Sequence, residues 1–202
     1  MARATEERRQ ALREKLVDLA CARIATDGSA ALRARDLASE AGCSVGAIYT
    51  VFGDMRDLLV AVNGRTFRDL GAHVAEAVAT SGAETPHDRM IAMASGYLDY
   101  AAAHPLRWRA LFDVALTEAD APPDWYLAAL DELLAMIDAP LGELFPTLDA
   151  EELRVRTRAL FSSVHGIVLL GLEERISGVA RARVMEMIRF VLTSIGSSRR
   201  KI

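Results

Sequence analysis

The side chains that most often do chemistry in proteins are few and widely spaced in this sequence. Its 202 residues include four histidines and two cysteines, and no two of them stand at the spacing that ligands of one metal ion adopt. These residues are His73, His87, His104, His165, Cys21 and Cys43. No glycine-rich phosphate loop and no nucleophile with an activating base can be placed either. We therefore predict that the protein is not an enzyme and that it holds no metal and no other cofactor.

Residues 33–58 have a pattern of residue types that predicts two short helices joined by a tight turn. The first part of this segment has apolar side chains at helical spacing up to Ala41. Gly42 can supply the positive φ that a sharp turn between helices needs, and Ser44 is a good N-cap for a second short helix. Because Gly46 lies near the start of that helix, a large partner could approach its backbone closely. This arrangement predicts a helix-turn-helix, whose second helix enters the DNA major groove by its N-terminal residues.

A longer pattern runs through the same positions. It reads A-x-x-A-G-x-S-x-G-x-[IL]-Y-x-x-F and is matched by Ala38, Ala41, Gly42, Ser44, Gly46, Ile48, Tyr49 and Phe52. The segment resembles the N-terminal DNA-binding domain of the TetR family of bacterial transcriptional regulators. Two weaker patterns, AAHPLRWRALF at 102–112 and the pair His165-Gly166, resemble the C-terminal domain of a subgroup that carries a W-x-x-x-H-G motif. In this chain Phe161 stands where that motif has tryptophan.

The resemblance implies DNA contacts at the start of the family's second helix and along its third helix. The corresponding positions here are Arg33, Ser44, Val45, Gly46, Ala47, Tyr49 and Thr50. The arginine and the hydroxyl side chains can donate hydrogen bonds to phosphate oxygens, which fix register without reading sequence. The short apolar side chains can meet a thymine methyl group, and Gly46 acts through the side chain that it lacks.

Two positions depart from the family pattern. Val51 stands where the family often has histidine, and Met55 stands where it usually has lysine, with Arg56 next to it. Two phosphate donors are therefore missing or displaced, although the backbone N–H groups at the start of the following helix remain available to a phosphate. Nine basic and nine acidic side chains also cancel over residues 1–60, so charge by itself does not indicate DNA.

The composition favours an all-helical protein. Hydrophobic residues make up 51% of the chain, only six residues are proline, and β-branched runs are scarce. We predict about nine helices in two domains. A three-helix helix-turn-helix domain spans residues 1–54, and a larger helical ligand-binding and dimerisation domain spans residues 55–202, with residues 55–80 as the connecting helix.

The resemblance implies that the larger domain binds a small molecule and forms a dimer. Methionine and aromatic side chains at helical spacing can line an apolar pocket, and they can equally be ordinary packed core. The pocket candidates are Met93, Tyr97, Trp108, Phe112, Trp125 and His165, of which His165 fits a hydrogen-bonded core or interface position better. The last two predicted helices, 149–176 and 178–197, have broad apolar faces that a monomer would leave exposed. The predicted dimer residues on them are Leu160, Val164, Val168, Val184, Ile188 and Val191.

These features together predict a homodimeric regulator, usually a repressor in this family, that a small hydrophobic or aromatic effector releases from a palindromic operator in double-stranded DNA. The longest apolar run, 166–172, is far shorter than the roughly 20 residues of a membrane span, so we expect no membrane partner. The two cysteines fit a reduced cytoplasmic setting. The alternative is a helical small-molecule-binding protein without specific DNA binding, which Val51 and Met55 favour.

Overall fold

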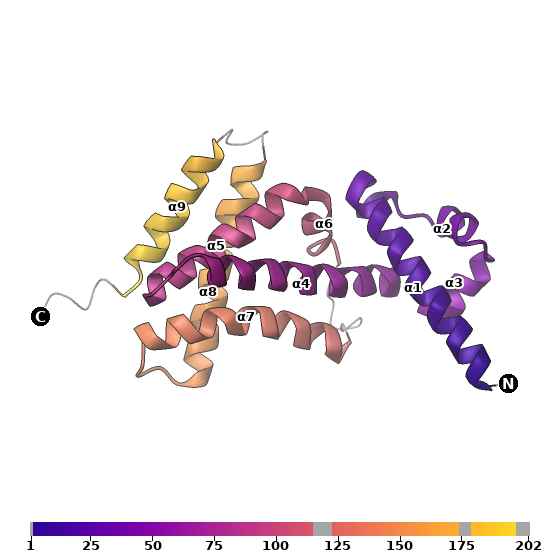
Figure 1. The fold of residues 1–202 in the computed structure, drawn as a ribbon, viewed down its shortest axis with the longest axis horizontal. Coiled ribbons are helices and arrows are strands. Elements are labelled where there is room, and N and C mark those ends of the chain that lie inside the picture. Colours follow the sequence, from indigo (N-terminus) through magenta and orange to yellow (C-terminus); the bar gives the residue numbers. More distant parts are fainter. Residues whose placement is uncertain (1, 115–122, 174–178, 197–202) are drawn as a thin grey trace, which may run out of the picture. The chain divides into compact units, whose positions relative to one another are not determined.

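The computed structural model describes residues 2–114, 123–173 and 179–196, and over these ranges the chain forms nine α-helices, one short 3-10 helix and no strand (Figure 1). The all-helical prediction is confirmed. The chain divides into two compact units, each built from two stretches of sequence. The N-terminal unit comprises Met1–Arg68 and His104–Leu127, and the C-terminal unit comprises Asp69–Ala103 and Ala128–Ile202. This division differs from the predicted boundary at residue 54, because α4 and α7 each contribute to both units.

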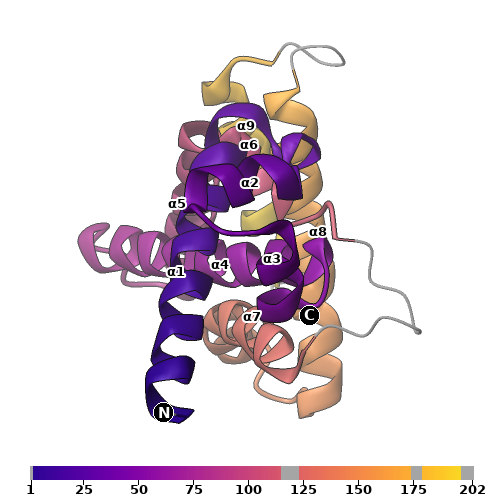
Figure 2. The ribbon, with the colours of Figure 1, turned by 90° about the vertical axis from the view of Figure 1, so that its right-hand side faces the viewer.

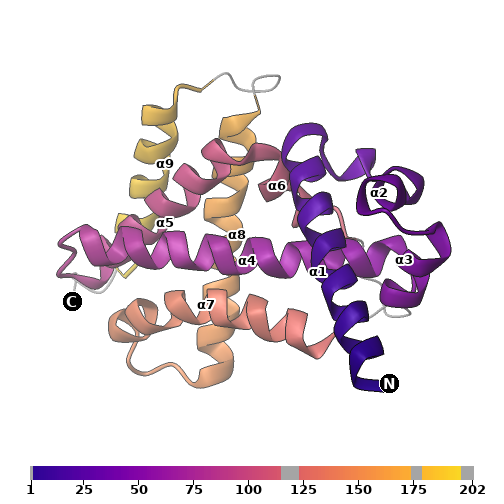
Figure 3. The same ribbon diagram turned by 45° about the vertical axis from the view of Figure 1, so that its right-hand side comes forward.

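The N-terminal unit is built around its first helix. Its elements are α1 (Ala2–Asp27), η1 (Ser29–Ala31), α2 (Ala34–Ala41), α3 (Val45–Phe52), the first part of α4 (Met55–Thr80), α6 (Pro105–Ala110) and the start of α7 (Asp124–Leu144). Helix α1 contacts α2, α3 and α6 (Figures 2 and 3). Their shared core includes Leu16 and Ile24 of α1, Leu37 of α2 and Ile48 of α3, each at most 1% exposed. The predicted helix-turn-helix is thus held by a core that other helices supply.

The turn between α2 and α3 forms as its sequence predicts. Gly42 adopts φ 70°, a conformation that glycine reaches without steric cost, and the N–H of Cys43 bonds the carbonyl of Ala38 at 3.0 Å. Ser44 then caps α3, because its Oγ accepts a hydrogen bond from the N–H of Ala47 at 3.2 Å. The two helices are therefore joined by only three residues, which fixes their mutual direction.

A buried amide ties α4 to α6 within the N-terminal unit. Asn63 is fully buried, and its Nδ2 donates a hydrogen bond to the carbonyl oxygen of Ala110 at 2.8 Å. Ala110 belongs to the same apolar core as α1, α2 and α3. Helix α6 is therefore part of the unit that holds the helix-turn-helix, which sequence spacing did not indicate.

The C-terminal unit contains the rest of α4 and α7 together with α5 (Pro86–Ala103), α8 (Ala150–Leu172) and α9 (Arg181–Ser194). Helix α5 contacts both α8 and α9, which also pack on each other (Figure 3). Two helix starts are capped in the expected way. Thr85 and Asp88 bond each other's backbone N–H groups ahead of α5, and Asp149 accepts bonds from the first turn of α8. The predicted end of one of the last two helices at residue 176, the predicted start of the other at residue 178 and its predicted end at residue 197 lie outside the described residues.

The apolar faces of α8 and α9 are largely buried by contacts within the same chain. Leu160, Val164, Val168, Val184 and Ile188, predicted to form the dimer, are all buried within the chain, and Val191 is half-buried. They face the helices that pack beside them in the same unit, so we reassign the first five to the core. An interface on these helices has to use their other faces.

Of the described helices, α8 alone is long and apolar enough, by length and composition, to cross a membrane. Its most apolar stretch reaches a mean hydropathy of 1.2. Core helices of water-soluble proteins meet the same criteria, and α8 packs on α5 and α9. This helix therefore gives no reason to assign a membrane span.

Replacing Asn63 by alanine is expected to lower the free energy of unfolding by about 1–3 kcal/mol, because the buried carbonyl of Ala110 loses its best donor. That carbonyl also accepts from the N–H of Asp113, at a longer 3.3 Å. Chemical denaturation followed by circular dichroism measures the change. Thr66→Val is the matched control, because the equally buried Thr66 bonds only a carbonyl of its own helix. Equal losses in the two variants would contradict a special role for the Asn63 bond.

Candidate nucleic-acid interface and ligand cavity

The exposed side of α3 and of the residues around it holds most of the predicted DNA-contacting positions. Arg33, Ser44, Gly46, Tyr49 and Thr50 are all exposed. The Tyr49 side chain, on a residue that is 45% exposed, is the large aromatic group of this surface. The hydroxyl of Thr50 donates a hydrogen bond to the carbonyl of Gly46 at 3.0 Å. Its oxygen can therefore still accept a hydrogen bond from a partner in solvent. The first turn of α3 thus presents small and hydroxyl-bearing groups to solvent.

The remaining two predicted positions are less accessible. Val45 and Ala47 are half-buried, and Val45 packs against the apolar core of the N-terminal unit. The structure therefore leaves only part of each side chain for a thymine methyl group. Arg33 donates two hydrogen bonds to carbonyls of the preceding loop, those of Ala30 at 2.7 Å and Leu32 at 2.9 Å. These bonds hold its guanidinium against the backbone and have to be exchanged before it binds a phosphate.

Gly46 has no internal reason to be glycine. It lies in a regular helix, and a Cβ built there meets nothing nearer than the Oγ of Ser44 at 3.8 Å. Alanine in a helix is more favourable than glycine by roughly 1 kcal/mol, so neither the fold nor local packing explains the choice. Nothing within the described structure therefore requires the side chain to be missing at this position.

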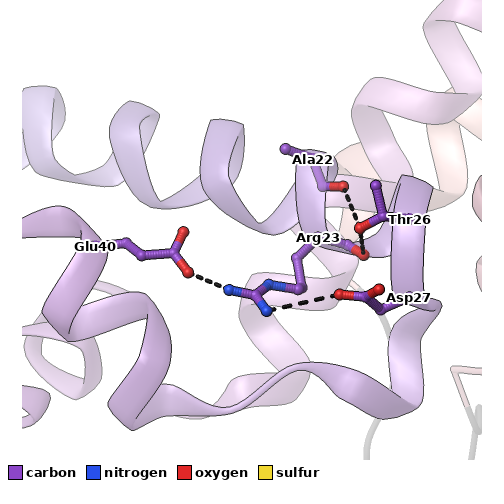
Figure 4. Close-up of polar contacts among 5 residues, drawn as sticks. All are labelled: Ala22, Arg23, Thr26, Asp27 and Glu40. Atoms are coloured by element: carbon purple, nitrogen blue, oxygen red, sulfur yellow. Dashed lines mark hydrogen bonds and ion pairs between the residues drawn. The ribbon is translucent and has the colours of Figure 1, made fainter.

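Helix α1 makes polar contacts with α2 and α3, the two helices of the helix-turn-helix, through three of its side chains. Lys15 Nζ donates to the carbonyl of Ala41 at 2.9 Å, at the end of α2. Arg23 forms ion pairs with Glu40 of α2 and, at 3.6 Å, with Asp27 of its own helix (Figure 4). The guanidinium of Arg13 lies 5.0 Å from the centre of the Phe52 ring at the end of α3. These contacts orient α2 and α3 without using any of the predicted DNA-contacting side chains.

The start of α4 differs from the sequence expectation. Asp54 caps the helix by accepting the N–H of Asp57 at 2.7 Å. This cap uses one of the N–H groups that were expected to be available and adds a carboxylate at the start of α4. Burial raises the pKa of the Tyr126 hydroxyl, whereas a hydrogen bond with Asn63 and the positive charge of Arg56 act in the opposite direction.

One basic residue of this surface was not predicted. Arg35 is exposed in the first turn of α2, two positions after Arg33, and no ion pair or side-chain hydrogen bond is found for it in the described residues. The signal in the sequence was the alternation Arg-Ala-Arg at a helix start. Arg35 therefore joins the candidate phosphate donors.

The C-terminal unit contains a partly open apolar cavity of about 60 Å³. Helices α4, α5, α7, α8 and α9 all contribute to its lining. The lining residues are Val74, Met90, Met93, Ala94, Tyr97, Leu133, Leu134, Met136, Ile137, Leu160, Phe161, Val164 and Leu192. None of them carries a charge, and the Tyr97 hydroxyl is the strongest hydrogen-bonding group among their side chains.

A ring cluster stands at the wall of this cavity. The Tyr97 hydroxyl lies 2.8 Å from Nδ1 of His165, and the Tyr97 ring meets the Phe161 ring edge-on with 5.8 Å between centroids. Phe161 stacks on His165, with centroids 5.8 Å apart and planes 18° apart. Burial of His165 penalises its charged form and lowers its pKa. The cluster is thus a neutral hydrogen-bonded pair supported by an aromatic ring one helical turn away.

The predicted pocket residues separate into two groups. Met93 and Tyr97 line the cavity, and His165 bonds Tyr97. Trp108, Phe112 and Trp125 belong to the N-terminal unit and do not line it. There Trp108 is buried, Phe112 packs edge-on against it, and the Trp125 ring lies against α4 at Gly64. No local pattern in the sequence indicates that these three residues belong to the N-terminal unit.

Comparison with known proteins agrees with this architecture. Residues 16–62 match the family model described as bacterial regulatory proteins, tetR family, and residues 90–195 match the model of the tetracyclin repressor-like C-terminal domain. The second match alone spans more than half of the chain. The protein belongs to the TetR family. Its N-terminal helix-turn-helix is the DNA-binding domain of a TetR transcriptional regulator, and its C-terminal unit is of the TetR type.

Solved structures show the same fold at low sequence identity. A protein of unknown function from Rhodococcus sp. RHA1 is 23% identical, with a TM-score of 0.72 over 93% of this chain and 94% of that one. A putative TetR-family regulator from Rhodococcus sp. is 20% identical, with a TM-score of 0.67 over 93% and 100% of the two chains. A tetR-family regulator from Streptomyces coelicolor is 19% identical, with a TM-score of 0.65 over 94% and 83%. No curated protein matches the sequence.

The lowered pKa of His165 predicts how stability depends on pH in this TetR protein. The unfolded chain binds a proton at the ordinary value of 6.5, whereas the folded protein binds it only at lower pH. Stability is therefore retained above pH 6.5 and falls as the pH drops below it. Urea denaturation at a series of pH values from about 7.5 to 5 measures this slope, which should be smaller in His165→Gln.

The matched control for this experiment replaces the exposed His104 by glutamine. An equal change of slope in both variants would contradict the assignment to His165. A slope that does not change in His165→Gln would contradict it as well.

Proposed function

We propose that this protein is a homodimeric, ligand-responsive transcriptional regulator in the cytoplasm, acting as a repressor on a palindromic operator. The observation that carries the DNA-binding part is the exposed first turn of α3, where Gly46 is open to solvent between the hydroxyl-bearing Ser44 and Tyr49. A helix without a side chain at this point can enter the major groove deeply enough for its neighbours to reach phosphates and base edges.

A palindromic operator needs two copies of the reading helix, about 34–36 Å apart. The large apolar side chains that the described part of the C-terminal unit leaves exposed are all on α8 and α9. They are Val155, Leu170, Met187 and Phe190, with Phe190 73% exposed. Along the exposed face of α8, Ala159, Ser162 and Gly166 are small, and nothing lies within 4 Å of a Cβ built at Gly166. We propose that a second copy packs on this face.

The cavity supports an effector-binding role for the C-terminal unit. An effector that releases the operator must bind the conformation with low DNA affinity more tightly than the other conformation. DNA must then weaken effector binding by the same factor. We also propose that this unit resembles the W-x-x-x-H-G subgroup, because Phe161 stacks on His165 at the spacing that this motif gives to its tryptophan and histidine.

The second candidate is a small-molecule-binding protein of this fold without specific DNA binding. The start of α4 favours it, since Val51 and Met55 offer no phosphate donor and Asp54 adds a carboxylate. Arg33, Ser44, Gly46, Tyr49 and Thr50 all remain exposed around α3, however, and neither the fold nor local packing requires glycine at position 46. We therefore place the regulator first.

The operator is sought by selecting genomic fragments on the purified protein at physiological salt. The wild type should enrich a palindrome, whereas Gly46→Glu combined with Tyr49→Phe should lose at least about 100-fold in affinity for it. The glutamate has room within the fold but directs a negative charge at the DNA. Ala75→Glu, which adds the same charge to the exposed surface of α4 in the C-terminal unit, is the control. If the wild type enriches no DNA fragment relative to the double variant, even at low salt, the result would favour the small-molecule-binding protein without specific DNA binding.

The dimer is tested by sedimentation of Phe190→Arg. A buried, unpaired arginine in the proposed interface should convert the dimer to monomers at micromolar concentration and weaken operator binding. Ala182→Arg adds the same charge to a different exposed face of α9 and should leave the dimer intact. A dimer in both variants would show that the two copies meet elsewhere.

A further inference from the structure

The apolar cavity of the C-terminal unit limits the chemistry of what it can bind. No charged side chain lines it, and the pair formed by Tyr97 and His165 at its wall is neutral in the folded protein because burial lowers the pKa of the histidine. A charged ligand would lose its hydration there without gaining an opposite charge, which is strongly unfavourable. The ligand is therefore expected to be uncharged.

The size of the cavity sets a second limit. At about 60 Å³ it is smaller than the roughly 150 Å³ that holds a benzene molecule in an engineered apolar cavity. Three methionines, Met90, Met93 and Met136, form part of its lining. Methionine has three rotatable side-chain bonds and readily changes shape, so the lining can widen without breaking a polar contact. A single ring is then within reach, whereas a fused multi-ring molecule is not.

The ring cluster supplies the third limit. Tyr97 lines the cavity, and its ring packs edge-on against Phe161, which also lines it. An aromatic ligand can extend this arrangement by one more edge-on or offset contact. A hydroxyl group can take part in up to three hydrogen bonds, so the bond from Tyr97 to His165 does not exhaust it.

We propose that the cavity binds an uncharged molecule of about the size of one aromatic ring, carrying one hydrogen-bonding group that meets the Tyr97 hydroxyl. This inference rests on the effector-binding role proposed above and gives it a ligand class. The aromatic wall selects the ring, Tyr97 orients its polar substituent, and the lack of an opposite charge excludes acids and amines of the same size.

The test compares four single-ring probes on the full-length protein at about pH 7, namely phenol, benzene, benzoate and benzylammonium. Isothermal titration and the shift in melting temperature both report binding. Phenol should bind most tightly, benzene about five- to tenfold more weakly for want of one hydrogen bond, and the two ions at least about 100-fold more weakly. An ion that binds as tightly as phenol would overturn the proposal, and so would the binding of none of the four.

Two variants locate the site. Tyr97→Phe should remove the preference for phenol over benzene while leaving benzene binding within about twofold, since only the hydroxyl is lost. Ala94→Leu fills the cavity from α5 and should abolish binding of both, whereas Ala103→Leu, on an exposed position of the same helix, should not. Phenol binding that persists in Ala94→Leu, or a preference that survives in Tyr97→Phe, would contradict the assignment.

The outcomes separate this inference from the proposed function. Operator binding without binding of any probe would refute the ligand class and leave the regulator intact. Phenol binding without operator recognition would retain the ligand class and refute the regulator. Release of the operator by phenol, absent in Ala94→Leu, would support both.

Discussion

The structure depends on α4 being one uninterrupted helix. Its backbone hydrogen bonds run from Met55 to Thr80, and its two parts belong to different units. In the first part Leu58 and Val62 complete the core behind the reading helices, and in the second part Val74 lines the apolar cavity. No loop interrupts α4 between Leu58 and Val74. Any influence of the cavity on DNA binding has its shortest covalent route through this element.

The reading helix itself has little stability of its own. Helix α3 has eight residues, and isolated helices of that length do not persist in water. It is stable here because Ile48 and Phe52 are buried in the core and because Arg13 and Ser44 hold its two ends. Part of that core comes from α6, more than fifty residues later in the chain, through Ala110 and its bond to Asn63. The residues that present the DNA-reading surface are thus separate from those that give it its shape.

Sequence reasoning worked where structure is decided locally. The turn at Gly42, the cap at Ser44 and the limits of α4 follow from the preferences of a few neighbouring residues. It failed where the outcome depends on distant partners. An apolar stripe such as Val164 and Val168 shows that a helix face is buried but not whether its neighbour is in the same protomer or in a second copy. Trp108 and Trp125 likewise gave no sign that their segment packs with the N-terminal unit, because nothing local encodes that choice.

Because α4 is continuous, the number of residues in it also sets the direction in which the side chains of its second part point relative to those of its first part. Each residue added to a helix turns everything beyond it by about 100° and advances it by about 1.5 Å. A single insertion between Gly64 and Asp69 would therefore turn the part of α4 that carries Val74 by about 100° relative to the part that carries Asn63. An insertion of seven residues, close to two full turns, would bring the same side chain back to within about 20° of its original direction. We therefore expect insertions and deletions to be tolerated in the loops of this chain. In α4, which contributes to two cores, only insertions close to a whole number of helical turns preserve the direction of the side chains.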